Sequence, residues 1–468
     1  MRDFKFSIPE DNPFRNDVLD RKNIAVNLTN IIDSQQDGMV LAIDSQWGTG
    51  KTTFIRMWRT LLANDNVYKE KFSTLYYNAW ENDYIKEPLI SVLSELNEQI
   101  VEKEETEIKS KLKKVMNELK PLVKSSGKVL LNVLTKGALE EYGVDGLLKD
   151  GLQQLSDNLG RLAFEEVEKG KNIRKELKER LKSFQKVADK KIVVFIDELD
   201  RCRPTYAIEL LETIKHIFDL DNYIFVISLD KQQLGESIKT VYGSEMDTIG
   251  YLRRFFDMDY KLPLIQKESY LEIKSREIEE KEAYIGVIIK FLRYFIINSN
   301  LSLRDIDKLF YFTKLLLQSE LKKINEKLCR MRDCDVICFL YAFFICLKFI
   351  DEKKFNEFLN GDYTSTTVEG MIKSDIISYK DKNVSKYDRF INKEDINNYY
   401  LPILKKYLLF EINNKKKITR YDFYEVNQTS NNHILRSCNI AALCNTEKIS
   451  IKNDLEFVNS FVIEEHGE

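Results

Sequence analysis

One stretch near the N-terminus constrains the fold more than any other: residues 39–53 read MVLAIDSQWGTGKTT. A short apolar run ends in a glycine-rich turn, and an amphipathic run follows. Strand, glycine turn and helix in this order direct backbone N–H groups and a helix N-terminus at one point, as a bound phosphate requires. Lys51 can reach the β- and γ-phosphates, and the Thr52 hydroxyl is placed to bind Mg²⁺. The stretch therefore predicts a site for a nucleoside triphosphate. The residues predicted to bind nucleotide here are Gln46, Trp47, Gly48, Thr49, Gly50, Lys51, Thr52 and Thr53.

The loop departs from the usual pattern G-x-x-x-x-G-K-[ST] at its first position, where Ser45 replaces glycine. Serine can make this bend only if its φ stays negative, so the change bears on the shape of the loop and not on the chemistry of Lys51 and Thr52. The alternative is an ordinary strand-to-helix turn that happens to contain these letters. A second motif argues against that alternative.

The second motif is residues 191–202, KIVVFIDELDRC. A nearly continuous apolar strand, typical of a parallel sheet that is covered on both faces, ends in adjacent acids. Buried acids are costly without a role. Asp197 at the strand tip can hold Mg²⁺ and its water, and Glu198 can polarise the attacking water. These two motifs together predict nucleotide hydrolysis.

Three more strands complete an expected α/β fold with a five-stranded, mainly parallel sheet. Aromatic and β-branched residues predict a strand over 72–80, with Trp80 as a packing residue at its end. A strand over 221–230 ends in polar side chains at Ser228 and Asp230, where a sensor of the γ-phosphate is expected. The fifth strand is expected over 256–262.

Two residues upstream of the phosphate loop are further candidates for the nucleotide pocket. Asp17 and Arg21 precede an amphipathic helix, and such an element often packs against the nucleotide base. The alternative is a helix start with an acidic cap and a solvated arginine.

Three arginines are candidates for stabilising transition-state charge. Arg253 and Arg254 stand just before the fifth strand and can act as arginine fingers toward a neighbouring subunit; a solvated basic pair is the alternative. Arg304 lies in the first turn of a helix that Ser302 and Asp305 are expected to cap. A cation there opposes the helix dipole, so a phosphate or an acidic partner could favour it.

The 468 residues suggest two to three domains, and 72 basic against 75 acidic residues give a net charge of −3 that does not demand a nucleic-acid partner. Seven cysteines without C-x-x-C spacing and three histidines argue against a zinc site. No secretory signal is apparent, which with reduced cysteines predicts a cytoplasmic protein. The longest apolar run, 336–347, is too short for a bilayer span and predicts a buried helix, with membrane contact as the alternative.

These stretches together resemble the KAP family of P-loop NTPases. The resemblance lies in residues 46–54, 77–80, 196–202, 228–230, 251–263 and 303–304, and covers roughly 10–310. It implies a sheet of the additional-strand class, with the fourth strand between the phosphate-loop strand and the Walker B strand, a helical lid, and ATP with Mg²⁺. Many members carry membrane spans in the insertion between the second and third strands; this chain has the insertion, about 88–190, without the spans.

The expected organisation is a P-loop NTPase domain over 1–265, a helical lid over 266–350 and a mainly helical region over 351–468. The expected function is an intracellular ATPase that switches the lid and a homo-oligomer or a partner protein. Bacterial relatives of the family are associated with defence against phage, and animal relatives with signalling scaffolds. The alternative is a scaffold that binds ATP with little hydrolysis. A small-molecule kinase is disfavoured because no acceptor-site signature is apparent.

Overall fold

The computed structural model describes residues 8–85, 87–101, 109–114, 117, 157–263, 267–276, 283–316, 334–360, 396, 400–402, 404, 405 and 408. The chain divides into two compact units, Met1–Leu264 and Ile265–Glu468. Most of the middle of the predicted insertion, and most of the chain after residue 360, lies outside the described residues.

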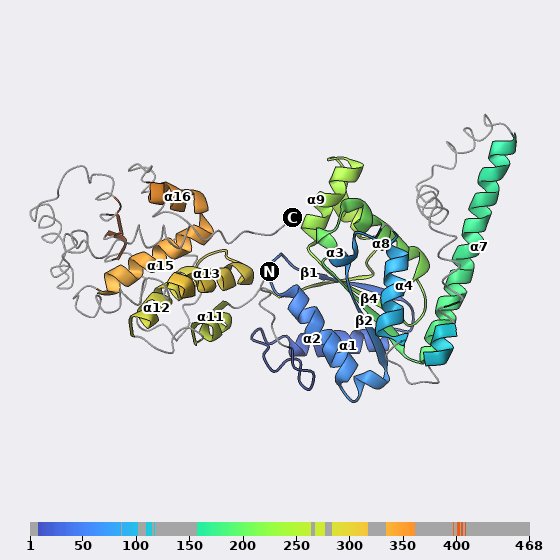
Figure 1. Ribbon diagram of the computed structural model, residues 1–468, viewed down its shortest axis with the longest axis horizontal. Helices are drawn as coiled ribbons and strands as arrows, with labels where there is room; N and C mark the ends of the chain where they lie inside the picture. Colours follow the sequence, from blue (N-terminus) through green and yellow to red (C-terminus); the bar gives the residue numbers. More distant parts are fainter. Residues whose placement is uncertain are drawn as a thin grey trace, which may run out of the picture. The chain divides into compact units, whose positions relative to one another are not determined.

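The first unit is built on one five-stranded sheet (Figure 1). Its strands are β1 (Met39–Asp44), β2 (Phe72–Asn78), β3 (Lys191–Asp197), β4 (Tyr223–Leu229) and β5 (Met258–Lys261). Their order is β2-β3-β4-β1-β5, and every neighbouring pair is parallel. The prediction that the fourth strand lies between the phosphate-loop strand and the Walker B strand is confirmed. All five carboxyl ends therefore meet at one edge.

Both faces of the sheet are covered, which explains why β3 is apolar at every position between Lys191 and its acid. Ile192, Val194 and Ile196 join one core cluster, and Val193 and Phe195 join the other. The helices α1 (Lys22–Ser34) and α2 (Lys51–Asn64) belong to the second cluster. The opposite face carries α4 (Pro88–Gln99), α7 (Asp157–Ala188), α8 (Pro204–Ile217) and α9 (Lys231–Tyr242) (Figure 1).

Three strands have bounds that differ from the predicted ones. β2 ends at Asn78, because the Asn78 side chain accepts hydrogen bonds from the N–H groups of Trp80 (3.1 Å) and Glu81 (3.3 Å) and so starts the short helix α3 (Ala79–Asn82). Trp80 therefore belongs to a helix, and its prediction as a strand-end residue was wrong. β4 and β5 are shorter than the predicted strands over 221–230 and 256–262, because each begins two residues later and ends one residue earlier.

The second unit is helical throughout its described part. It contains α11 (Lys267–Arg276), α12 (Ala283–Ile297), α13 (Leu303–Leu316), α15 (Cys334–Ile350) and α16 (Glu352–Asn360). Ser302 Oγ accepts from the N–H of Asp305 (3.2 Å), and Asp305 Oδ2 accepts from the N–H of Ser302 (3.0 Å), which confirms the predicted capping box.

The longest apolar run lies in α15 and is buried, as predicted. Its aromatic rings pack on α12, with Phe339 5.3 Å from Phe291 and 5.6 Å from Phe295 between ring centroids. None of the helices that the structure describes is both long enough and apolar enough to cross a membrane.

Candidate nucleotide site at the carboxyl edge of the sheet

The phosphate loop joins β1 to α2 and depends on two glycines. Gly48 has φ 73° and Gly50 has φ 82°, values in the left-handed region that favour glycine. The φ of Ser45 is not positive, so serine makes this bend without backbone strain. Its hydroxyl lies 2.8 Å from that of Thr49, which in turn donates to the carbonyl of Gln46 at 2.8 Å. Ser45 therefore stabilises the loop through a hydrogen bond between two of its own side chains.

Arg21 stabilises the phosphate loop through hydrogen bonds to its backbone. Its guanidinium donates to the carbonyls of Gly50 (Nη1, 3.1 Å) and Thr49 (Nη2, 2.9 Å), and the side chain is only 3% exposed. Asp17 accepts from the backbone N–H groups of Leu19 and Arg21 and so shapes the turn before α1. Burial lowers the pKa of Arg21 to about 10, which leaves it charged at neutral pH. Arg21 thus faces the main chain of the phosphate loop.

Lys51, the first residue of α2, reaches back over the loop. Its Nζ donates to the carbonyls of Ser45 and Gln46, the second at 3.1 Å. Burial lowers the pKa of Lys51, and four carboxylates near it act in the opposite direction. They are those of Asp200, Asp230, Asp197 and Asp44. The lysine and the Walker B acid therefore converge, although about 145 residues separate them in the sequence.

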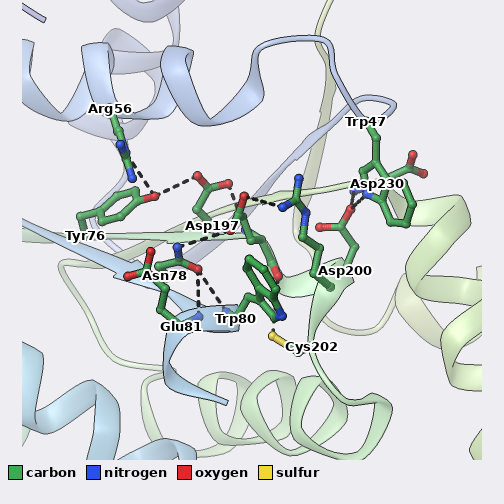
Figure 2. A network of polar contacts seen from close by, with 12 residues as sticks. Trp47, Arg56, Tyr76, Asn78, Trp80, Glu81, Asp197, Asp200, Cys202 and Asp230 are labelled. Carbon is green, nitrogen blue, oxygen red and sulfur yellow. Dashed lines mark hydrogen bonds and ion pairs between the residues drawn. The ribbon is translucent and has the colours of Figure 1, made fainter. Parts of the chain in front are cut away.

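Asp197 ends β3 and is 1% exposed (Figure 2). Its Oδ2 accepts from the Tyr76 hydroxyl at 3.0 Å, and its Oδ1 accepts from the N–H of Glu198 at 3.0 Å. Arg56 Nε lies 3.4 Å from the Tyr76 hydroxyl and completes a chain from α2 to the acid. The carboxylate is therefore fixed in direction from two sides.

Glu198 follows in a left-handed conformation, with φ 59°. A non-glycine residue adopts this conformation at an energetic cost, and such residues cluster at functional sites. One carboxylate oxygen lies 3.2 Å from Arg201 Nη1, and the other accepts from Asn78 Nδ2 at 3.3 Å. Burial raises the pKa of Glu198, against the effect of Arg201. The Arg201 guanidinium also lies 5.6 Å from the centre of the Trp80 ring.

The end of β4 lies between the phosphate loop and Walker B, as the strand order requires. Ser228 is fully buried, and among the described residues its Oγ has no hydrogen-bond partner. Asp230 caps α9 by accepting from the N–H groups of Gln232 (3.1 Å) and Gln233 (3.2 Å). A buried hydroxyl without a partner at this place is consistent with a ligand that supplies one.

Comparison with known families fits this geometry. A family profile described as "KAP family P-loop domain" matches residues 21–315, well over half of the chain. The chain belongs to the KAP family of P-loop NTPases. No curated protein matches it. Among solved structures, one that resembles it is the ORC2 protein of Aeropyrum pernix, in ADPNP–ADP complexes. That likeness covers 87% of this chain and 88% of the other, at 13% identity and a TM-score of 0.35.

The residues of this KAP domain fit a nucleotide with Mg²⁺. Left-handed glycines open the loop backbone, Lys51 supplies a cation, and the buried Ser228 hydroxyl can take a new partner. Thr52 and Thr53 stand partly buried in the first turn of α2, beside the loop. Thr52 and Asp197 carry oxygen atoms of the kind that Mg²⁺ prefers as ligands.

The three candidate arginines are all exposed. Arg253 and Arg254 are exposed in the turn after the short helix α10 (Thr248–Leu252) of the KAP domain. Arg304 is exposed in the first turn of α13, in the second unit. Their roles in catalysis stay predictions.

Four side chains of the site were not assigned a role from the sequence. They are Tyr76, Asn78, Asp200 and Arg201. All four lie at or just beyond the ends of β2 and β3, which pair in register from Phe72 opposite Lys191 to Asn78 opposite Asp197. Polar residues at the carboxyl ends of adjacent parallel strands are the signal that could have found them.

Proposed function

We propose that this chain is a Mg²⁺-dependent ATPase whose hydrolysis cycle switches its helical second unit and a homo-oligomer or partner protein. The observation that carries the proposal is the convergence of Lys51, Asp197 and Glu198 at one edge of the sheet. A cation from the phosphate loop beside two successive acids is the arrangement that phosphoryl transfer to water uses.

Each residue has a distinct part in this proposal. The loop amides and Lys51 bind the phosphates, and Thr52 and Asp197 hold the metal ion. Mg²⁺, when bound, neutralises charge that develops on the phosphate oxygens. Glu198 accepts a proton from the attacking water, for which its pKa, raised by burial, makes it a better base than an ordinary carboxylate. Ser228 or Asp230 senses the γ-phosphate.

The biological setting is proposed from kinship alone. Relatives in the KAP family make anti-phage defence or a related signalling complex the proposed context. In an assembly of subunits, Arg253 and Arg254 reach a neighbouring phosphate because they are exposed, and Arg304 contributes from the second unit. Sizing the protein with and without a slowly hydrolysed ATP analogue tests for assembly; an unchanged size in both conditions contradicts a nucleotide-driven oligomer.

The test of the enzyme is phosphate release from Mg-ATP without any added acceptor. Lys51→Ala should abolish turnover, and Glu198→Gln should bind ATP and retain it. Lys22→Ala, an exposed lysine at the start of α1, is the matched control and should keep wild-type turnover. Wild-type turnover by Glu198→Gln shows that Glu198 is not the base.

A second function is favoured by one observation. Both carboxylate oxygens of Glu198 are engaged, by Arg201 and Asn78, so the base is held rather than free. This arrangement suits a scaffold that binds ATP and hydrolyses it slowly. Turnover below roughly one per minute, with partners present, favours the scaffold, since typical enzymes turn over about ten times per second.

A further inference from the structure

One buried carboxylate outside the proposed catalytic set joins two loops of the nucleotide site. Asp200 lies in the single turn η3 (Leu199–Arg201) directly after β3 and is 7% exposed. Its Oδ2 accepts from the Trp47 indole Nε1–H at 2.5 Å and from the backbone N–H of Asp230 at 3.0 Å (Figure 2). A single oxygen atom therefore receives two donors from two different segments.

The two donors come from the segments that follow the neighbouring strands β1 and β4, beyond the last aligned pair of those strands, Asp44 with Leu229. Trp47 is in the middle of the phosphate loop, and Asp230 is the residue that follows β4 and caps α9. The Trp47 side chain is 46% exposed, so the hydrophobic core does not fix it. Its orientation depends on the bond to Asp200. The loop is thus tied at its tip to the end of the strand where a phosphate sensor is expected.

A charged acceptor strengthens the bridge. Hydrogen bonds to a carboxylate are shorter and stronger than those between neutral groups, and an indole N–H can only donate. Burial raises the pKa of Asp200, while the Trp47 indole and Lys51 both favour its ionised form. These partners offset part of the desolvation of the carboxylate, which without them is more expensive.

We propose that Asp200 is a positioning residue that holds the phosphate loop in its nucleotide-binding shape by tying Trp47 to the start of α9 at Asp230. The inference rests on the proposed nucleotide site and does not depend on hydrolysis. Nucleotide affinity should therefore fall when the bond between Asp200 and Trp47 is lost. Binding of a nucleotide to the loop should in turn change the surroundings of Asp230.

The bridge can be observed directly because the chain has three tryptophans. In protein labelled with ¹⁵N-tryptophan, the three indole N–H signals are resolved by NMR, and Trp47→Phe identifies the signal of residue 47. Asp200→Asn should move that signal upfield and leave the other two in place. Asp221→Asn, an exposed acid before β4, is the matched control and should move none.

The functional readout is the Kd for Mg-ADP by calorimetry, which a protein that never hydrolyses ATP also gives. Trp47→Phe and Asp200→Asn should each raise the Kd roughly 3- to 10-fold, the range for loss or weakening of one hydrogen bond of ordinary strength. In the double variant, the second change should add little to the first, because both act on the same bond: Trp47→Phe removes its donor, and Asp200→Asn replaces the charged acceptor by a neutral amide oxygen. If the Kd for Mg-ADP changes in this way while the protein shows no ATP turnover, the bridge is supported and the proposed enzyme is rejected.

Three results would overturn the inference. The first is a Trp47 indole signal that does not move in Asp200→Asn. The second is a double variant whose effect on the Kd is the product of the two single effects. The third is unchanged Mg-ADP binding by Trp47→Phe, which needs no substitution at a buried site and so decides the matter if Asp200→Asn does not fold.

Discussion

Arg201 and Glu198 form an ion pair with 3.2 Å between Nη1 and Oε1, so the proposed catalytic base meets a cation from its own turn. The Arg201 guanidinium lies over the Trp80 ring, which orients it. Both side chains are partly exposed. The pair therefore acts on the ionisation of Glu198 more than on the stability of the fold.

The first prediction concerns pH. Burial raises the pKa of Glu198 and Arg201 lowers it, and the base must be ionised to accept a proton. Arg201→Met should therefore move the acidic limb of the pH–rate profile to higher pH. The profile of kcat/KM from pH 5 to 9 measures this. Arg203→Met, on the neighbouring exposed arginine, should leave the limb in place. A limb that moves to lower pH, or that does not move, contradicts this account of the pair.

The second prediction concerns the metal. The Tyr76 hydroxyl donates to the Asp197 carboxylate, which is the proposed Mg²⁺ ligand. Tyr76→Phe removes the donor and keeps the ring, so the Mg²⁺ concentration for half-maximal activity should rise at least roughly 10-fold, as for other partners of metal ligands. A titration with Mg²⁺ at saturating ATP measures it. Tyr84→Phe, with a side chain that is 76% exposed, serves as control, and an equal rise in that variant excludes a specific effect.

The third prediction concerns Arg21. A lysine at this position keeps the charge but loses the two-pronged geometry that reaches both Gly50 and Thr49. Arg21→Lys should raise the Kd for Mg-ADP by roughly 10-fold, because a single ammonium group does not replace both guanidinium hydrogen bonds to the partly buried loop carbonyls. Calorimetry measures the Kd, and Arg15→Lys, at an exposed site in the same segment, should not change it. If Arg21→Lys binds Mg-ADP as the wild type does, the guanidinium does not shape the loop.

The fourth prediction concerns stability. Glu212 is buried in α8, and burial raises its pKa to about 7 from the ordinary 4.5, with Glu209 adding to the effect. Since the folded state holds this proton more tightly than the unfolded state, the free energy of unfolding falls as pH rises from about 4.5 to about 7. Glu212→Gln should therefore be more stable than the wild type at pH 8, by about 1–3 kcal/mol, and nearly equal to it at pH 4.5.

Thermal unfolding at both pH values tests this prediction. Glu236→Gln, on an exposed glutamate of α9, should show no comparable gain at pH 8. A Glu212→Gln protein that is less stable than the wild type at pH 8 means that the ionised carboxylate has a stabilising partner in the fold.

Several elements of both units could be predicted from the sequence, because the residue patterns that identify them are local. Apolar runs that end in polar residues gave β1, β3 and β4, and the parallel order then brings their ends together. The Ser302–Asp305 cap was also readable, since both partners lie three residues apart. In each case the signal that identifies the element is carried by residues that lie close together in the sequence.

The contacts that shape the site are of another kind. Trp47 and Asp200 are 153 residues apart, and Asn78 and Glu198 are 120 apart. Such pairs depend on strand register and on the direction of single side chains, which periodicity does not encode. The end of β2 could have been predicted, because Asn78 followed three residues later by Glu81 is the pattern of a helix start. The aromatic residues before it favoured a longer strand.

The position of β2 at the border of the sheet also says where this protein can tolerate change. The chain leaves this outermost strand and returns at β3, its immediate neighbour, and the described helices α4 and α7 of this connection pack on one face of the sheet. Because the two strands are adjacent, a change in the length of the connection between α4 and α7 leaves the order of the strands unchanged. For an engineer, that makes this connection a place to insert a fluorescent or receptor module while the nucleotide site is kept.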